Sequence, residues 1–156
     1  MSPKKQSLQE LKVSAIRNGT VIDHIRNEST FKVAEILNLM HEGRMVLIGV
    51  NLPSGSLGRK GIVKIEDRAV TPQEANKIAL IAPEATLNII KDYRVIEKRH
   101  VVLPQVVEGI VRCINPSCVT NQQAVGSCFD VLGVAPPTLR CVYCERVMSG
   151  RDIILK

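Results

Sequence analysis

The amino-acid sequence predicts an α+β fold in two domains, and three observations lead to this prediction. Stretches typical of strands alternate with amphipathic ones along the first two thirds of the 156 residues. Pro104 then marks a break, after which no convincing helical period appears. The remaining segment instead contains four cysteines in two close pairs. We therefore expect a sheet-and-helix domain over residues 1–104 and a small all-β domain over residues 105–156.

A strand and a helix are expected first. The segment 12–25 contains two short apolar stretches around the turn sequence 17–20, in which Asn and Gly tolerate positive φ. Asn27 or Ser29 is suited to cap a following helix, and Gly43 lies just beyond its expected end. Apolar residues recur there at the i, i+3, i+4 and i+7 positions of one helical face. These residues are Val33, Ile36, Leu37 and Met40.

Two strands and the start of a second helix are expected next. β-Branched and aliphatic residues over 45–52 predict a strand, and an extended pattern resumes over 60–66 after a loop. Thr71, Pro72 and Glu74 then indicate a helix start. Thr is a good N-cap, Pro suits the first helical position, and Glu closes a capping box.

The predicted strands and helices of the first domain follow one another in the order of a known fold with an antiparallel sheet. The second helix should stop near Pro83, and two short strands are expected after it, over 86–90 and 93–99. The order strand–helix–strand–strand–helix–strand is that of the split βαβ unit. We therefore predict a ferredoxin-like antiparallel sheet with two helices on one face.

The paired cysteines predict a metal site in the second domain. Their spacing is Cys113-x4-Cys118 and Cys141-x2-Cys144. Each close pair can present two thiolates to one ion from a tight turn, and four thiolates in a tetrahedron suit zinc. A domain this small also needs an additional cross-link, such as a bound metal, because its hydrophobic core is small. Four protein ligands leave no open position, so we expect a structural zinc ion, one per chain, and a zinc-binding domain.

Two alternatives to a metal site stay open at this point. The pairs could be buried thiols or disulfides, or Cys141 and Cys144 could form a redox motif. The surrounding sequence lacks the strand–motif–helix pattern of thioredoxin-like proteins, and a redox motif leaves the other pair unexplained. Cys128 lies beside Phe129 and is expected to be a small core residue.

The composition is typical of an intracellular protein. No apolar run approaches the roughly 20 residues that span a bilayer, and the N-terminus lacks the apolar stretch of a signal peptide. The formal net charge is +6, with 16 Lys and Arg against 11 Asp and Glu in residues 1–104, and five against four in residues 105–156. We expect a cytoplasmic protein. Its charge forms either a solvated basic surface or a site for an anion, and the first domain is the better placed of the two to attract an anion.

Several residues of the first domain are candidates for anion binding. Asp23 and His24 follow the first predicted strand. Lys60 and Lys64 share one face of the third strand because side chains alternate, and Lys98 ends the last strand. Each lysine alone is expected to be exposed to solvent, but together they can surround a phosphate chain.

No pattern in the sequence supports catalysis by this chain. The loop over residues 54–60 contains glycines and a lysine but lacks the spacing of a phosphate-binding P-loop. Neither an activated nucleophile with a histidine base nor a pair of carboxylates in a catalytic pattern is apparent. The candidate residues therefore point to binding.

Several short motifs follow one another along the chain: Gly19–His24, Asn51–Gly55, Gly58–Lys60, Ala82–Thr86 with Asn88, and the four spaced cysteines. Taken together, they resemble the regulatory chain of aspartate carbamoyltransferase. The resemblance covers residues 10–156 and implies a non-catalytic subunit. It implies that the first domain binds nucleotide effectors, CTP as inhibitor and ATP as activator, and pairs with its twin in a homodimer. It implies that the zinc domain docks on the catalytic chain, which condenses carbamoyl phosphate with aspartate in pyrimidine biosynthesis.

The resemblance also implies roles for individual residues. Lys64 and Asp23 should lie near the ribose and base of the nucleotide. His24 and Lys98 should lie near the phosphates, and Lys60 near the phosphates or a second nucleotide. The residues that should line the pocket or flank the base are Val13, Ile16, Val21, Asn88 and Tyr93.

Two departures from the family pattern are visible. Ser14 stands where relatives can carry an acidic residue, and residues 132–137 replace a more polar, basic stretch. The second departure bears on docking, for which Asn115, Glu145 and Arg146 are the candidate contacts.

A nucleic-acid-binding zinc ribbon is the alternative function. The zinc domain is nearly neutral and aromatic stacking residues are scarce, so we expect neither nucleic-acid nor membrane binding.

Overall fold

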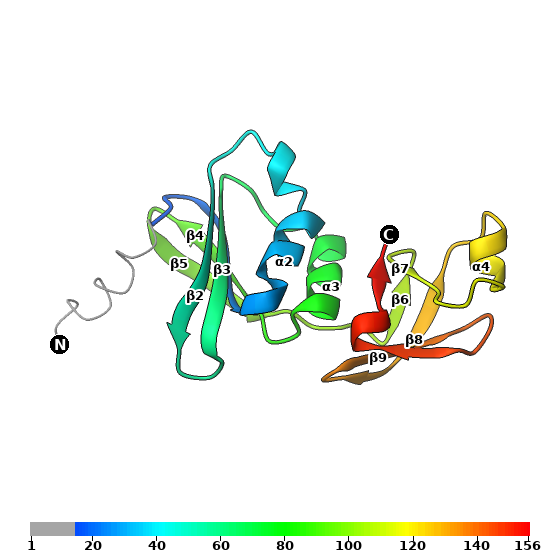
Figure 1. Cartoon of the computed structure of the whole chain (residues 1–156). Coiled ribbons are helices and arrows are strands. Elements are labelled where there is room, and N and C mark those ends of the chain that lie inside the picture. The colour runs from blue at the N-terminus through cyan, green and yellow to red at the C-terminus, as the bar shows by residue number, and fades with distance from the viewer. Residues whose placement is uncertain (1–14) are drawn as a thin grey trace.

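The first part of the chain folds as an antiparallel sheet covered on one face by two helices (Figure 1). The computed structural model describes residues 15–156. The sheet has five strands in the order β2-β3-β1-β4-β5, which confirms the ferredoxin-like prediction, with β5 paired beside β4. The elements are β1 (Gly19–Arg26), α2 (Thr30–Ile36), β2 (Val46–Ser54), β3 (Gly58–Glu66), α3 (Pro72–Ile81), β4 (Thr86–Lys91) and β5 (Arg94–His100).

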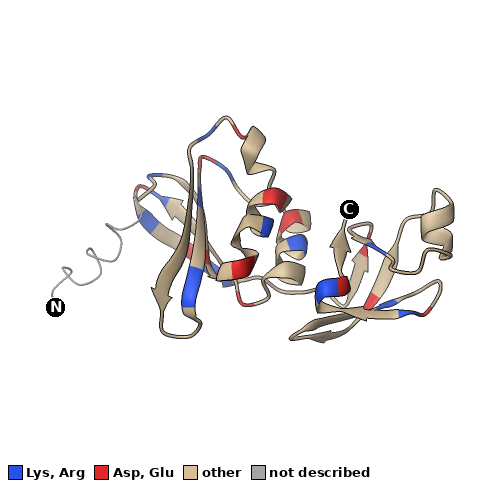
Figure 2. Ribbon diagram, in the orientation of Figure 1, with Lys and Arg blue, Asp and Glu red and all other residues tan. Residues whose placement is uncertain are grey.

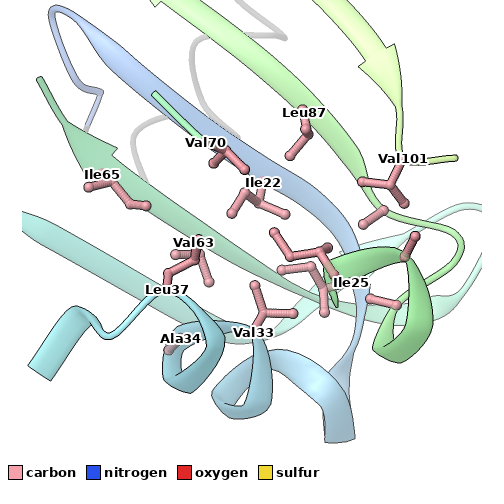
Figure 3. Packing of buried hydrophobic residues seen from close by; sticks show 14 of the residues in the cluster. Ile22, Ile25, Val33, Ala34, Leu37, Val63, Ile65, Val70, Leu87 and Val101 are labelled. Atoms are coloured by element: carbon pink, nitrogen blue, oxygen red, sulfur yellow. The ribbon is translucent and has the colours of Figure 1, made fainter. Parts of the chain in front are cut away.

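Side-chain alternation decides which residues of the sheet face the helices. Ile22, Val63 and Leu87 are paired neighbours on β1, β3 and β4, and all three are buried in the cluster under α2 and α3 (Figure 3). The residues beside them along each strand point to the opposite face. A smaller apolar cluster lies there, made of Ile16, Val21, Ile62 and Ile90.

The helix α3 begins as the sequence predicts. The Thr71 hydroxyl accepts the N–H of Glu74 at 3.1 Å, and the Glu74 carboxylate accepts the N–H of Thr71 at 3.0 Å. Pro72 occupies the first turn, and the helix is capped at Ala82. Within residues 15–156 no helix is long and apolar enough to cross a membrane.

The helix α2 is shorter than the sequence predicts. It ends at Ile36 because Asn38 adopts a left-handed conformation with φ 56°, which interrupts the helical hydrogen bonds. Met40 therefore lies outside the helix, with 87% of its surface exposed. Ser29 forms no capping hydrogen bond, since a short 3₁₀ turn over Asn27–Ser29 leads into the helix.

Gly19 begins β1 where a side chain does not fit. Its φ is +143°, and a Cβ atom would overlap the carbonyl oxygen of Ile65 on β3. Gly19→Ala should lower the free energy of unfolding by about 2–4 kcal/mol in urea denaturation. The control is Gly55→Ala, whose Cβ would meet nothing within 4 Å. Equal stability of the two variants would contradict this reading of the β1–β3 contact.

The second part of the chain is built from short strands, as predicted, with one four-residue helical turn and a 3₁₀ turn over Gly150–Asp152. Its core contains Phe129, Leu139 and Met148, and Leu80 of α3 packs into the same cluster. Two sheets form, with the orders β10-β9-β8-β6 and β11-β7. The elements are β6 (Val106–Glu108), β7 (Val111–Arg112), α4 (Val119–Gln122), β8 (Cys128–Val134), β9 (Pro137–Cys141), β10 (Val147–Ser149) and β11 (Ile154–Leu155).

Candidate functional site

The four paired cysteines form one compact cluster. Their Sγ atoms lie within 4.8 Å of one another, with 3.6 Å between Cys113 and Cys144 and 3.7 Å between Cys118 and Cys141. Four ligands about 2.3 Å from a central ion would lie about 3.8 Å apart in a tetrahedron. A disulfide, by contrast, needs a sulfur separation of about 2.05 Å. The cluster therefore has the dimensions of a metal site.

Backbone groups of the turns support the sulfurs. Each sulfur accepts a hydrogen bond from the backbone N–H two positions further along the chain. Such donors favour the thiolate, which is the form that binds a metal. The donors are Asn115 to Cys113, Thr120 to Cys118, Tyr143 to Cys141, and Arg146 to Cys144, and Cys141 accepts a further, stronger hydrogen bond from the N–H of Cys144.

The four thiols influence one another's ionisation. Burial, together with hydrogen bonds to the other cysteines, raises the pKa of Cys113 to about 12. Burial opposes ionisation of Cys144, but bonds from the Arg146 N–H and the Asn115 side chain outweigh it and lower its pKa to about 7. Thiolates this close repel one another unless a cation lies among them. The donor set therefore fits a divalent, thiophilic ion.

Cys128 lies apart from the cluster. It is half-buried on β8, whereas its neighbour Phe129 is fully buried, because alternate residues of a strand face opposite sides. The predicted core position of Cys128 is therefore wrong. Burial and the carboxylates of Glu108 and Asp130 raise the pKa of its thiol.

The three candidate docking residues surround the metal cluster. Glu145 and Arg146 are exposed, and Glu145 turns the chain after Cys144 with φ 63°. The Asn115 side chain is used inside its own turn, where its Oδ1 accepts the N–H of Ser117 at 3.1 Å. The charged pair is thus exposed to solvent, whereas the Asn115 side chain is used within the cysteine turns.

Four residues of the predicted nucleotide site form one row across the sheet. Lys64 on β3 pairs with Val21, Val21 pairs with Asn88, and Asn88 pairs with Lys98 on β5. The row lies on the face opposite the helices, and Figure 2 shows basic segments along β3 and on the β4–β5 hairpin. Lys64 is only 8% exposed, because it lies on an inner strand, so the expected exposure of each lysine is wrong for it.

A bulge in β1 places the Asp23–His24 pair. The pairing of β1 with β3 shifts between Ile22 and Ile25, and His24 has φ 56°. The Asp23 carboxylate accepts the N–H of His24 at 2.7 Å and forms an ion pair with Lys60 at 2.8 Å. Asp23 and Lys60 therefore neutralise each other beside the row.

The bulge also turns His24 into a cavity of about 350 Å³. His24 Nδ1 lies 3.1 Å from the Thr86 hydroxyl, and Lys98 and His100 line the same cavity. Sequence reasoning missed Thr86 and His100. The register pairs these two residues with each other, and His100 lies two positions after Lys98 on the same face. The remaining lining residues are Ser56, Leu57 and Glu84.

The apolar candidates lie on the same face. Ile16 and Val21 belong to the small cluster there, next to the buried side chain of Asn88. Among the residues described, Asn88 Oδ1 has no hydrogen-bond partner. Tyr93 lies apart, 66% exposed at the β4–β5 turn, and Val13 lies outside the described residues.

Comparisons with known proteins match the two parts of the chain separately. The family described as aspartate carbamoyltransferase regulatory chain, allosteric domain, matches residues 11–102, and the metal binding domain of the same chain matches residues 105–154. The aspartate carbamoyltransferase regulatory chain of Pyrococcus abyssi is 52% identical over 149 residues, 94% of this chain and 98% of the relative. That of Porphyromonas gingivalis is 50% identical over 147 residues, 94% and 97% of the two chains. That of Bacteroides fragilis is 43% identical over 155 residues, 99% of both. The chain therefore belongs to the family of aspartate carbamoyltransferase regulatory chains.

Proposed function

We propose that this regulatory, non-catalytic chain binds CTP and ATP in residues 1–104 and transmits their effect to the catalytic chain through a zinc domain in residues 105–156. The observation that carries the proposal is the cavity at His24, Lys98 and His100, which adjoins the row of Lys64 and Asn88. We place this activity in the cytoplasm, where pyrimidine biosynthesis would use it.

The cavity suits the phosphate chain of a nucleotide. A nucleoside triphosphate is polyanionic near pH 7, and charge-assisted hydrogen bonds to lysine or protonated histidine are the strong ones. Lys98 is exposed and faces the cavity with His24 and His100. Lys60 is held by Asp23, so it would contribute to phosphate binding only after releasing that carboxylate.

The row beside the cavity suits the nucleoside. The apolar side chains of Ile16 and Val21 offer a surface for the flat base. Asn88 Oδ1 is a buried acceptor without a partner among the described residues, and such an atom favours a ligand with a hydrogen-bond donor. Cytosine and adenine share an exocyclic amino group, which supplies that donor. This chemistry supports CTP and ATP as a pair of effectors.

The metal cluster suits a structural zinc ion. Its four cysteines fill a tetrahedron and leave no position for water or substrate. When bound, the ion would hold the two cysteine turns together and neutralise their thiolates. The residues of these turns would then be rigid enough to act as a docking surface, with Glu145 and Arg146 exposed on it.

The direct test of the proposed function is reconstitution with the aspartate carbamoyltransferase catalytic chain. Aspartate saturation should shift on adding CTP or ATP to the complex but not to the free catalytic chain. Arg146→Ala should keep zinc and nucleotide binding, yet loosen the complex and reduce the effector response. A free catalytic chain that responds to nucleotide as strongly as the complex does would overturn the proposal.

We also propose that the chain forms its homodimer through the edge strand β2. The sheet has two edges, β2 and β5. The edge strand β5 carries Arg94, Glu97, Lys98, Arg99 and His100, and charges of this kind oppose strand pairing. By contrast, β2 contains no charged residue over Val46–Ser54. Pairing of β2 with its twin would therefore join two sheets at a low electrostatic cost.

This dimer proposal predicts a difference between the two edges. Ile48, on β2, is 38% exposed, and Ile48→Lys would place like charges near each other across the two-fold axis. We expect the dimer dissociation constant to rise about 100-fold or more in sedimentation equilibrium. The matched change Ile96→Lys on β5 should leave it unchanged. Dissociation by the Ile96 variant instead would assign the dimer to β5.

A further inference from the structure

Glu84 lies between the proposed phosphate cavity and the second part of the chain. It follows the C-terminus of α3 and precedes β4. Its side chain lines the cavity that contains His24, Lys98 and His100. It also lines two further cavities, of about 300 and 410 Å³, whose other walls include residues 134–137. One carboxylate therefore borders both the cationic cavity and the tip of the β8–β9 hairpin.

The hairpin tip reaches back toward the first part of the chain. In the register of β8 and β9, Val134 pairs with Pro137, so Ala135 and Pro136 form the turn. Figure 1 shows this end of the hairpin pointing toward the sheet and its helices. Pro83 and Glu84 face it across both further cavities. The segment 132–137, in which this sequence departs from the family pattern, thus shares two cavities with the domain that carries the proposed effector site.

The carboxylate of Glu84 is only partly compensated. Its Oε1 forms an ion pair with Arg26 Nε at 3.0 Å. Its Oε2 is buried and, among the described residues, has no hydrogen-bond partner. Arg26 lines the 410 Å³ cavity at the hairpin tip but does not line the phosphate cavity. A polyanion in the phosphate cavity would repel the Glu84 carboxylate and attract the Arg26 guanidinium. The two side chains of the ion pair would therefore be pushed in opposite directions.

We propose that Glu84, acting with Arg26, is a positioning residue that couples the proposed phosphate cavity to the β8–β9 hairpin. The inference rests on the proposed nucleotide site. Like charge in the cavity displaces the Glu84 carboxylate toward the hairpin. The hairpin tip, which faces Pro83 and Glu84 across the two further cavities, then changes its position. Coupling is reciprocal, so a partner that fixes the hairpin also changes anion affinity.

The experiment uses the full, zinc-loaded chain and inorganic tripolyphosphate, which carries the charge of the phosphate chain without a base. Calorimetry measures its affinity, and amide NMR shifts of Val134 and Ala135 report the hairpin. Glu84→Gln keeps the shape of the side chain and removes its charge. Glu28→Gln is the control, because it removes one charge from an exposed residue that lines none of the three cavities.

In the parent and in Glu28→Gln, tripolyphosphate should bind and shift both hairpin amides. In Glu84→Gln it should bind about 3- to 10-fold more tightly, because a like charge is gone, while the hairpin shifts are largely lost. Binding to the parent without a hairpin response would overturn the coupling and leave the proposed site intact. A full hairpin response in Glu84→Gln would also overturn it. A parent that binds no tripolyphosphate would overturn the phosphate site and the coupling together.

Discussion

Removing the metal should unfold residues 105–156 and leave the sheet-and-helix domain folded. The second core is small and three of its buried residues are metal-cluster cysteines, so without an ion it would lose the bonds that hold the two cysteine turns together. The binding energy of a structural zinc ion is largely folding energy, about 10 kcal/mol or more in small metal-dependent domains. The first core lies under α2 and α3 and contains none of the four cysteines.

Two-dimensional amide NMR during titration with a strong chelator or a mercurial would show this difference. The signals of residues 105–156 should collapse together as the metal leaves, while those of β1 to β5 stay dispersed. Leu80 should report the change, because it packs into the second core from α3.

The identity and number of ligands can be checked on the same protein. Metal analysis should return one zinc per chain, and Cys141→Ser should lose it. Cys128→Ser should keep full zinc content, because Cys128 lies outside the cluster. Redox-active iron in place of zinc, or a metal-free protein whose second domain stays folded, would refute the structural role of zinc.

Replacing Lys98 with alanine should weaken CTP and ATP binding by about 1–3 kcal/mol, or roughly 5- to 150-fold. Lys98 is exposed and lines the proposed phosphate cavity, so its loss removes a charge-assisted bond without opening a core. The midpoint of thermal unfolding should therefore stay near that of the parent. Calorimetric titration with each nucleotide measures the change.

The matched control is Lys91→Ala, which removes an exposed lysine from the other strand of the same hairpin. Lys91 is not among the described residues that line the cavity at His24. The nucleotide affinity of this variant should therefore stay within about twofold of that of the parent. UTP offers a second contrast, because uracil carries an oxygen where cytosine has its amino group. UTP should bind more weakly than CTP if Asn88 Oδ1 accepts that group. Equal losses in the Lys98 and Lys91 variants would show that the site is misplaced.

Lys64→Ala is expected to behave differently from Lys98→Ala. Lys64 is 8% exposed on an inner strand, so its replacement removes buried methylene groups as well as a charge. We expect a loss of both nucleotide affinity and stability. The sequence alone suggested equal behaviour, because each lysine was expected to be exposed to solvent and the strand pattern does not tell how deeply a side chain is covered.

The local features of this fold could be predicted because they depend on neighbouring residues. Thr71, Pro72 and Glu74 form the capping box in the structure because the cap involves only the first turn of the helix. The end of α2 was mispredicted because the apolar pattern does not show the backbone conformation of a single residue. The periodicity of Val33 to Met40 continues past Asn38, but a single left-handed residue stops the helix whatever the pattern beyond it.

The sequence by itself determined the family, the two-part organisation of elements and the set of four cysteines, since order and spacing along the chain carry these. Only the tertiary structure decided which side chains meet. The bulge in β1 turns His24 toward Thr86, the β4–β5 register places His100 beside them, and the β8–β9 hairpin approaches Glu84. The physical reason is that strand register and hairpin packing depend on the free energy of contacts between segments that are distant in sequence. The periodicity of one segment carries no information about those contacts.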